Sequence, residues 1–255
     1  MIELNTVIQG DCIQVMKDID DESIDMVLCD LPYQVTNLPW DTIIPFEPLW
    51  AAYKRIIKKN GAIVLTASQP FTSKLVMSNL EMFKYEWIWE KSKSTGFLDC
   101  SYRPMRSHEN ILVFYTEKPT YNAQKEEGEP WNRGRVKRPK SCWGEQAEHY
   151  AENTTGERHP KSVIKIPNGN NNSIHPTQKP TELFSYLIRT YTNAGDLVLD
   201  NTSGSCTTAI SCINTGRNYI CIEQDETYCQ LGRQRIAKHL QGQSGNLFHP
   251  DLLEP

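Results

Sequence analysis

The tetrapeptide Asp30-Leu31-Pro32-Tyr33 directly follows an apolar run that ends at Cys29. A proline biases the residue before it toward an extended conformation, which can turn the Leu31 carbonyl into a pocket. The Asp30 carboxylate and this carbonyl would then offer two acceptors for the two hydrogens of an amino group. The Tyr33 ring could stack on a flat base. The four residues therefore indicate chemistry on an exocyclic amine, although a simple Asp-x-Pro turn at a strand end would have the same pattern.

A second polar segment, Asp200-Asn-Thr-Ser-Gly-Ser-Cys-Thr-Thr208, lies between an apolar run and a helical pattern. An acid about 20 residues after such a turn can bind ribose hydroxyls, and Glu223 ends the next apolar run at about that spacing. Gly204 is the one glycine of the segment, and neither G-x-G-x-x-G nor a P-loop is present. This disfavours a diphosphate and an oxidoreductase cofactor. It favours a nucleoside without phosphates, or else an ordinary strand-to-helix turn.

Two further segments place polar groups where ligands often bind. His175-Pro-Thr-Gln-Lys-Pro180 precedes a helical pattern. Its polar side chains at a helix N-terminus suit a carboxylate, and a loop that only starts the helix is the alternative. Asp11 follows Gly10 at the end of a strand pattern. It could bind the amino group of an adenine, cap the next helix, or do both.

A basic stretch stands out against the net charge of −4, which by itself argues weakly against a nucleic-acid partner. The segment 131–140 holds five basic residues and no acidic one: Arg133, Arg135, Lys137, Arg138 and Lys140. Such cations neutralise phosphates, and Trp131 and Trp143 could stack on bases. The stretch therefore indicates either contact with DNA or a solvated loop.

Composition is that of a soluble globular protein, with 38% hydrophobic and 23% charged residues in a chain of 255. No apolar run approaches the roughly 18 residues that span a bilayer, and the N-terminus does not resemble a signal peptide. We therefore expect a cytoplasmic protein without a membrane partner. None of the eight cysteines forms a Cys-x-x-Cys pair. We expect no metal site, and buried free thiols at positions such as Cys29 and Cys221.

Strand and helix patterns alternate along most of the chain. Strands are expected at 7–9, 24–29, 62–66, 85–89, 111–115, 197–199 and 219–222, and helices at 12–19, 46–58, after Pro70, and at 181–191, 207–214 and 228–240. Gly61 should end the helix at 46–58. The alternation predicts an α/β fold with a doubly wound, mostly parallel sheet.

The periodicity disappears over 116–172, where Gly, Pro, Asn, Lys and Arg dominate. An irregular stretch of this length inside a compact domain is usually functional or disordered. We therefore expect one core made of 1–115 and 173–255, with 116–172 inserted into it.

Taken together, these motifs resemble the β group of the amino-group DNA methyltransferases that use S-adenosylmethionine. Two further segments, Trp87-Ile-Trp-Glu-Lys-Ser and His108-Glu-Asn-Ile-Leu-Val-Phe-Tyr115, look similar to phage or prophage members. The amine motif comes first in the chain and the cofactor motif last, directly after His-Pro-Thr-Gln-Lys-Pro. The likeness covers nearly the whole chain except about 116–172. It implies a Rossmann-like fold, with that insertion as the target-recognition region.

The resemblance also implies roles for single residues. Asp30, Leu31, Pro32 and Tyr33 would hold the target base. The cofactor would be bound by Asp11, Asp30, His175, Thr177, Lys179, Asp200, Asn201, Thr202, Gly204, Ser205 and Glu223. Within that set, Glu223 would take the ribose, Asp11 would lie near the adenine, and Lys179 would lie near the methionine end.

The chain departs from the family pattern at four positions. Leu31 stands where the family has proline, and we expect little effect because the backbone carbonyl does the holding. Asn201, Thr202 and Cys206 replace a proline, a phenylalanine and a glycine of the cofactor loop. The lost ring and the added Cys206 side chain should weaken cofactor binding mildly.

The predicted function is therefore site-specific methylation of double-stranded DNA, with adenine N6 favoured by the aspartate at the first motif position. Cytosine N4 is the nearest alternative. Methylation of a protein glutamine is disfavoured by the basic stretch, and a non-catalytic nucleic-acid-binding protein is the alternative from another class. A homodimer and a cognate restriction enzyme stay open, and no target sequence can be read from the recognition stretch.

Overall fold

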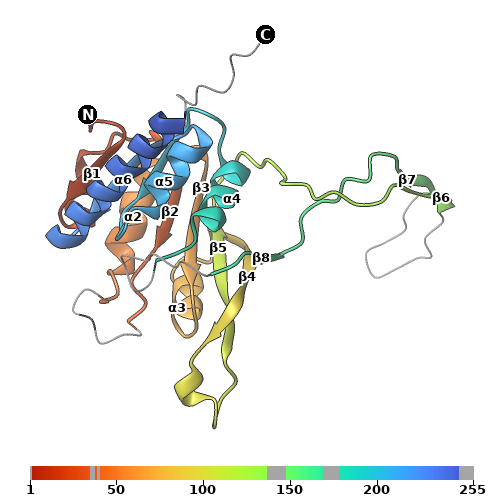
Figure 1. Cartoon of the computed structure of the whole chain (residues 1–255), viewed down its shortest axis with the longest axis horizontal. Coiled ribbons are helices and arrows are strands. Elements are labelled where there is room, and N and C mark those ends of the chain that lie inside the picture. Colours follow the sequence, from red (N-terminus) through yellow and green to blue (C-terminus); the bar gives the residue numbers. More distant parts are fainter. Residues whose placement is uncertain (1, 35–37, 39–40, 137–147, 169–177, 247–255) are drawn as a thin grey trace. The chain divides into compact units, whose positions relative to one another are not determined.

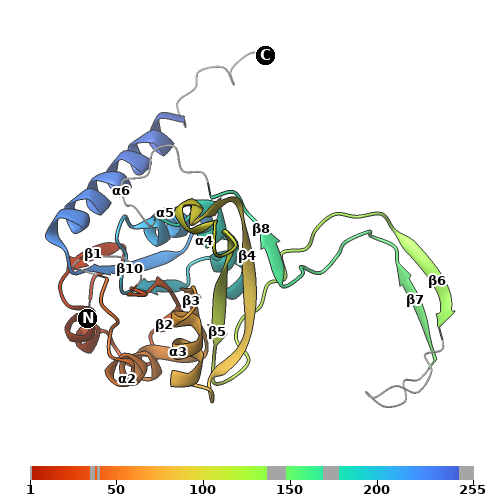
Figure 2. The ribbon, with the colours of Figure 1, turned by 90° about the horizontal axis from the view of Figure 1, so that it is seen from below.

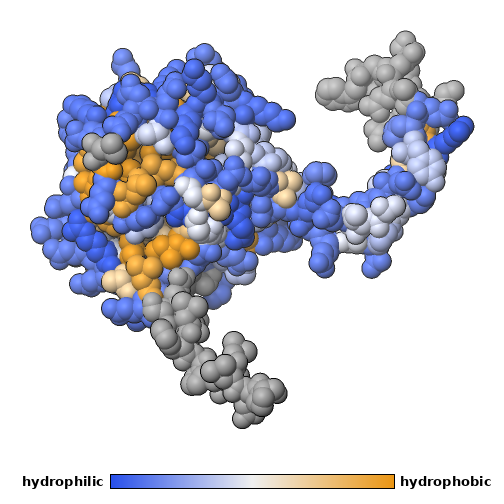
Figure 3. Space-filling view, turned by 90° about the horizontal axis from the view of Figure 1, so that it is seen from above, coloured by the Kyte–Doolittle hydropathy of each residue, from blue (hydrophilic) through white to orange (hydrophobic). Residues whose placement is uncertain are grey.

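The computed structural model describes residues 2–246 except 35–37, 39–40, 137–147 and 169–177. Its contacts divide the chain into a larger unit, 1–122 with 162–255, and a smaller unit, 123–161. No described helix is long and apolar enough to cross a bilayer. In the space-filling view most residues are hydrophilic, and apolar residues gather over part of the face that is drawn (Figure 3), which is ordinary for a folded protein.

An eight-stranded sheet forms the larger unit (Figure 1). Its order is β1 (Thr6–Gln9), β10 (Asn218–Glu223), β9 (Leu197–Asp200), β2 (Ile24–Asp30), β3 (Ile57–Ala67), β5 (Arg106–Phe114), β4 (Phe83–Thr95) and β8 (Val163–Lys165). Strand β5 runs antiparallel to both of its neighbours, and the other described pairs are parallel. The predicted α/β fold with a mostly parallel sheet is confirmed.

Helices cover both faces of this sheet (Figure 2). One face packs against α1 (Cys12–Val15), α2 (Phe46–Ile56) and α3 (Phe71–Ser78), and the other against α4 (Thr181–Tyr191), α5 (Thr207–Thr215) and α6 (Glu226–Asn246). Alternate residues of a strand point to opposite faces. In β2, Val27 and Cys29 therefore enter the first core, and Met26 and Leu28 enter the second. Burial on both faces explains why this strand reads as a nearly continuous apolar run.

The strand order reverses between β2 and β9, which are neighbours in the sheet. From β2 the chain moves through α2 to β3 on one side, and from β9 it moves through α5 to β10 on the other. In open α/β sheets, ligands bind at such a switch point, beyond the carboxyl ends of the strands. Asp30 ends β2 and Asp200 ends β9, so the two motif aspartates meet there.

Two local expectations are wrong. The helix expected at 46–58 ends at Ile56, and β3 begins at Ile57 and runs through Gly61. A Cβ at Gly61 would lie 2.8 Å from the Ile57 side chain and 2.9 Å from the Asp25 carbonyl oxygen. The glycine therefore allows close approach of a neighbouring strand rather than ending a helix. The helix expected at 12–19 divides into α1 and a 3-10 turn, Met16–Asp18.

Cysteine chemistry follows the expectation where it is described. The seven described cysteines are free thiols, and all except Cys100 are buried. Cys29 and Cys221 are among the buried ones. They therefore act as small core residues.

The smaller unit holds a two-stranded antiparallel sheet, β6 (Trp131–Val136) and β7 (His149–Asn153). Outside these two strands, the backbones of Glu126 and Arg158 form an isolated antiparallel β-bridge. The unit is narrower than the expected insertion of 116–172, because β8 pairs with β4 in the sheet of the larger unit. These three strands are short, and most of their residues are exposed or half-buried. They therefore lack the apolar pattern by which the other strands were predicted.

Candidate active site

A pocket of about 920 Å³ lies at the switch point. Its volume lies in the range of small-molecule sites. The lining includes every described residue that the sequence motifs single out for the site: Asp11, Asp30, Leu31, Pro32, Tyr33, Lys179, Asp200, Asn201, Thr202, Gly204, Ser205 and Glu223. His175 and Thr177 lie outside the described residues. The fold therefore brings together motifs from both ends of the chain.

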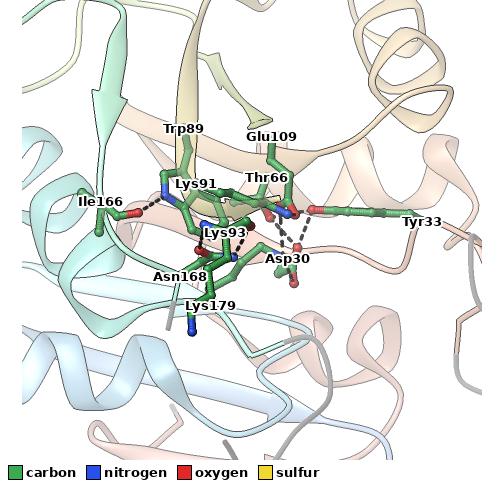
Figure 4. Close-up of polar contacts among 10 residues, drawn as sticks. All are labelled: Asp30, Tyr33, Thr66, Trp89, Lys91, Lys93, Glu109, Ile166, Asn168 and Lys179. Atoms are coloured by element: carbon green, nitrogen blue, oxygen red, sulfur yellow. Dashed lines mark hydrogen bonds and ion pairs between the residues drawn. The ribbon is translucent and has the colours of Figure 1, made fainter. Parts of the chain in front are cut away.

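Asp30 is held through both carboxylate oxygens (Figure 4). Its Oδ1 accepts hydrogen bonds from the Tyr33 hydroxyl and the Thr66 hydroxyl, each at 2.5 Å. Its Oδ2 accepts from Lys179 Nζ at 2.5 Å. Each oxygen of an ionised carboxylate can accept about two hydrogen bonds. Among the described contacts, Oδ1 is therefore saturated, whereas Oδ2 keeps one acceptor direction for a ligand.

Leu31 and Tyr33 pack tightly beside this carboxylate. The Leu31 side chain is buried in the core against α1–α3, which gives it a packing role that the sequence did not indicate. The Tyr33 ring stacks on Phe71, with ring centroids 5.1 Å apart. Burial, together with the charges of Asp30 and Glu109, raises the pKa of Tyr33 well above its usual value. Tyr33 is therefore a neutral phenol that donates to Asp30.

Asp200 shapes the turn after β9 rather than offering a free carboxylate. Oδ1 accepts from the Thr202 backbone N–H at 3.1 Å and Oδ2 from the Thr208 hydroxyl at 2.5 Å. Burial raises the pKa of Asp200 to about 7. The Thr202 hydroxyl donates to the Asp30 main-chain carbonyl at 3.2 Å, which joins the two motifs directly.

Asn201 faces both the core and the pocket. Its Oδ1 accepts hydrogen bonds from the Tyr53 hydroxyl at 2.6 Å and from Cys29 Sγ at 2.8 Å. Its Nδ2 is buried and has no hydrogen-bond partner among the described residues. Asn201 is therefore tied to the core through its oxygen, and its nitrogen is shielded from the pocket.

Glu223 closes the loop from the neighbouring strand. Its two carboxylate oxygens accept from the backbone N–H groups of Gly204 at 2.7 Å and Asp225 at 2.9 Å. Burial raises the pKa of Glu223 above its ordinary value. Each oxygen still has one acceptor direction left for hydroxyl groups. The geometry therefore suits a polyol such as a ribose.

The sequence left two roles open: whether Asp11 caps a helix, and whether the Cys206 side chain enters the cofactor site. Asp11 Oδ1 accepts from the Gln14 backbone N–H at 3.0 Å, so the capping of α1 is confirmed. Cys206 is fully buried, and it is absent from the pocket lining although its neighbours Ser205 and Thr207 are present. The Cys206 side chain therefore does not fill ligand space.

Three polar residues of the site were not singled out from the sequence: Thr66, Lys91 and Glu109. Lys91 Nζ lies 2.5 Å from Glu109 Oε1, and Glu109 Oε2 lies 3.4 Å from Lys179 Nζ. The only sequence signal was a charge or hydroxyl at the edge of an apolar strand, which is too common to be specific. Their partners come from other strands, so only the folded sheet shows the connection.

The segment before the His-Pro-Thr-Gln-Lys-Pro motif is fastened to β4. Asn168 Oδ1 accepts from the Lys93 backbone N–H at 2.9 Å, and its Nδ2 donates to the Lys93 carbonyl at 2.9 Å (Figure 4). The Trp89 indole N–H donates to the Ile166 carbonyl at 2.8 Å. These contacts position the chain that leads toward Lys179.

The basic stretch is described only in part. Arg133 and Arg135 are exposed on β6, and the Arg133 guanidinium lies 5.1 Å from the Trp131 ring centroid. Lys137, Arg138 and Lys140 lie outside the described residues. Exposed cations next to an aromatic ring are suited to nucleic acid.

Comparison with known proteins identifies the family of this chain. A family model described as DNA methylase matches residues 24–234. DNA adenine methyltransferase YhdJ of Escherichia coli is 27% identical, over 93% of this chain and 85% of the relative. The solved structure of the M1.HpyAVI–SAM complex superposes with a TM-score of 0.62 at 23% identity, covering 90% of this chain and 98% of that chain.

A second solved structure, the cytosine-N4-specific PvuII DNA methyltransferase, has a TM-score of 0.65 at 14% identity, covering 97% of this chain and 87% of that chain. At these identities the two structures support the Rossmann-like fold, and the family model supports more. It matches residues 24–234, which is more than half of the chain. The chain therefore belongs to the DNA methylase family.

Proposed function

We propose that this protein transfers a methyl group from S-adenosylmethionine to the exocyclic amine of a base flipped out of double-stranded DNA, with adenine N6 as the favoured acceptor. The observation that carries the proposal is Asp30 Oδ2. This oxygen is fixed by Lys179, keeps one acceptor direction, and lines the same pocket as Glu223.

The pocket residues suit S-adenosylmethionine. Glu223 keeps acceptor capacity for ribose hydroxyls. The family resemblance assigns the same loop to this cofactor, and M1.HpyAVI was solved in complex with SAM. When bound, S-adenosylmethionine supplies a methyl group on a sulfonium sulfur, which keeps the electron pair of the broken carbon–sulfur bond.

The protein's own part in the reaction is to hold the amine and to stabilise charge. Asp30 Oδ2 and the Leu31 carbonyl each accept one hydrogen of the –NH2 group, which leaves the nitrogen lone pair pointing away from them. Positive charge grows on the nitrogen as it forms its bond to the methyl carbon, and a fixed carboxylate stabilises that charge. The methylated nitrogen then releases one proton, and Asp30 Oδ2 or a water molecule accepts it.

The DNA surface would come from two places, each considered within its own unit. Arg133 and Arg135 are exposed in the smaller unit. In the larger unit, the strands β4 and β5 extend as a hairpin beyond the sheet (Figure 1). Its tip exposes Phe97, Leu98 and Tyr102, while Thr95 and Arg106 in its arms line the pocket. Exposed aromatic and basic groups beside the pocket favour a nucleic acid over a small free amine.

The choice between adenine and cytosine rests on the family resemblance and on the relatives, and not on a contact in the pocket. An aspartate at the first motif position leans toward adenine by resemblance, and YhdJ is an adenine methyltransferase. Cytosine N4 stays the alternative, because PvuII methyltransferase has the same fold and that specificity. Both amines present two hydrogens to the same pair of acceptors, so the site chemistry alone does not separate them.

The test is methyl transfer from radiolabelled S-adenosylmethionine to DNA, followed by digestion to nucleosides and mass analysis. We expect N6-methyladenine from the wild type. Asp30→Ala and the isosteric Asp30→Asn should abolish transfer while cofactor binding survives, and Asp18→Ala, at an exposed carboxylate, should be fully active. If the product is N4-methylcytosine instead, the acceptor is cytosine and not adenine. Wild-type rates in both Asp30 variants would refute the assignment, and a wild type that binds DNA without transfer would favour a non-catalytic protein.

A further inference from the structure

Four charged side chains form a continuous chain of alternating sign, called here the charge chain: Lys91, Glu109, Lys179 and Asp30. The ion-pair distances along it are 2.5 Å, 3.4 Å and 2.5 Å. Each residue comes from a different element, β4, β5, the segment before α4, and the end of β2. All four line the pocket, and Figure 4 shows their side chains gathered together.

The charge chain is largely withdrawn from solvent. The exposed fractions of the Lys91, Glu109, Lys179 and Asp30 side chains are 9%, 13%, 8% and 20%. Two ammonium and two carboxylate groups leave no net charge, which is the arrangement that buried charges require. Burial opposes the charge of Lys179, but Asp30 and Glu109 outweigh this effect, and the pKa of Lys179 is raised. Lys179 therefore stays an ammonium beside Asp30.

The Lys179 ammonium, paired with the Asp30 carboxylate, has two opposite consequences for amine methylation. It fixes Oδ2, which helps to place the amine. It also puts a positive charge next to a nitrogen that becomes positive, which opposes the reaction. A second carboxylate on the far side of Lys179 offsets this opposition without moving Oδ2. Glu109 is that carboxylate.

We propose that Glu109, itself held by Lys91, is a positioning residue that shares the charge of Lys179, so that Asp30 Oδ2 is fixed in place but stays electrostatically negative toward the amine. The inference rests on the proposed methyl transfer and extends it to residues that do not touch the base.

The contacts of Glu109 agree with an electrostatic role. Its Oε2 is buried and accepts no hydrogen bond within the described residues, and it meets Lys179 as an ion pair. Within the part of the chain that the structure describes, Asp30 also interacts with Tyr33, which is neutral, and with Asp200 across the switch point. Among the described neighbours of Lys179, Glu109 is thus the carboxylate that can balance it besides Asp30.

The test measures kcat, KM and their pH dependence for Glu109→Gln and Lys179→Met. Glu109→Gln adds net positive charge beside Asp30, which favours the ionised form. We expect kcat to fall at least about tenfold with the KM for S-adenosylmethionine within about twofold. The acid limb of the kcat profile should move to lower pH. Lys179→Met removes the cation, so its acid limb should move to higher pH. Opposite shifts would not arise from loss of packing.

Glu90→Gln is the matched control, since it neutralises a neighbouring carboxylate that pairs on the surface with Lys165. It should leave kcat and the profile unchanged. Should Glu109→Gln fail to fold, the Glu109→Gln/Lys91→Met double variant removes one charge of each sign. It should lower kcat and move the acid limb in the same direction but by less, because the removed Lys91 charge lies beyond Glu109 along the charge chain.

Wild-type kcat and an unchanged acid limb in the Glu109 variants, with an active wild type, would overturn the positioning role alone. Acid limbs that move in the same direction for Glu109→Gln and Lys179→Met would overturn it as well. A folded wild type that transfers no methyl group to any DNA would instead refute the proposed function, and the positioning role with it.

Discussion

Cys206 and Gly232 are fitted to each other across the α5–α6 contact. Cys206 has a left-handed backbone conformation (φ 58°) at the N-cap of α5, and its fully buried sulfur faces Gly232 of α6. A Cβ added at Gly232 would overlap Cys206 Sγ. The cysteine that stands at a family glycine position is therefore accommodated by a glycine, which has no side chain, in the next helix, and the pocket is left clear.

This fit predicts a coupled effect on stability. Gly232→Ala should lower the free energy of unfolding by about 1–3 kcal/mol, because the added methyl group overpacks the contact. Cys206→Gly should suppress that cost, since it removes the clashing sulfur and suits the left-handed backbone. Urea unfolding of both single variants and the double variant measures the coupling. Additive effects of the two substitutions would contradict the contact.

Asp200 predicts a pH dependence of stability. Burial raises its pKa to about 7, against about 3.9 in an unfolded chain. Between these values the folded state keeps a proton that the unfolded state has lost, so stability falls as the pH rises through this window and is constant in this respect above it. Asp200→Asn should therefore lose less stability than the wild type between pH 5 and pH 8, by about 1–3 kcal/mol. Chemical denaturation at both pH values measures this, with Asp18→Asn as the control. An equal loss of unfolding free energy in the wild type and in Asp200→Asn would exclude Asp200 as the source of the pH dependence.

Glu223 predicts a separation of cofactor binding from catalysis. Glu223→Gln replaces one acceptor oxygen by an NH2 group that cannot accept from Gly204 or Asp225. We expect the Kd for S-adenosylmethionine to rise about tenfold, while kcat at saturating cofactor stays within about threefold. Calorimetry and steady-state kinetics check this against Glu226→Gln, an exposed acid of α6. A fall in kcat with unchanged Kd would place Glu223 outside cofactor binding.

Arg133 and Arg135 predict a salt-dependent, sequence-independent loss of DNA affinity. Each phosphate contact contributes about one unit to the slope of log K against log salt. Arg133→Ala and Arg135→Ala should each reduce that slope by about 1 and weaken binding to any sequence alike. Fluorescence anisotropy over a range of salt concentrations measures it, and Lys238→Ala, exposed on α6, is the control. Slopes equal to that of the wild type would exclude these arginines from the DNA surface.

Local sequence determined most of the elements and the position of both motifs. Strand β2 is buried on both faces, and helix α4 presents one apolar stripe, so each leaves a pattern in the sequence that needs no knowledge of its partners. Asp30 and Glu223 could be found because each follows such a strand directly. The exposed strands β6, β7 and β8 left no comparable pattern. Gly61 was wrongly predicted to end a helix, because the need for a glycine there comes from the backbone of Asp25 in the neighbouring strand.

Only the tertiary structure decided which side chains of the site contact each other. Lys91 and Glu109 are ordinary charges in the sequence, and Lys179 was assigned there to the cofactor rather than to Asp30. Only the fold brings the three into line with Asp30. It also decided that Asp200 is occupied by its own turn, and that the Cys206 side chain leaves the pocket toward Gly232. The physical reason is the same in each case. Which side chain a strand carries is local information, whereas the partner of a buried charge depends on contacts between segments that lie far apart along the chain.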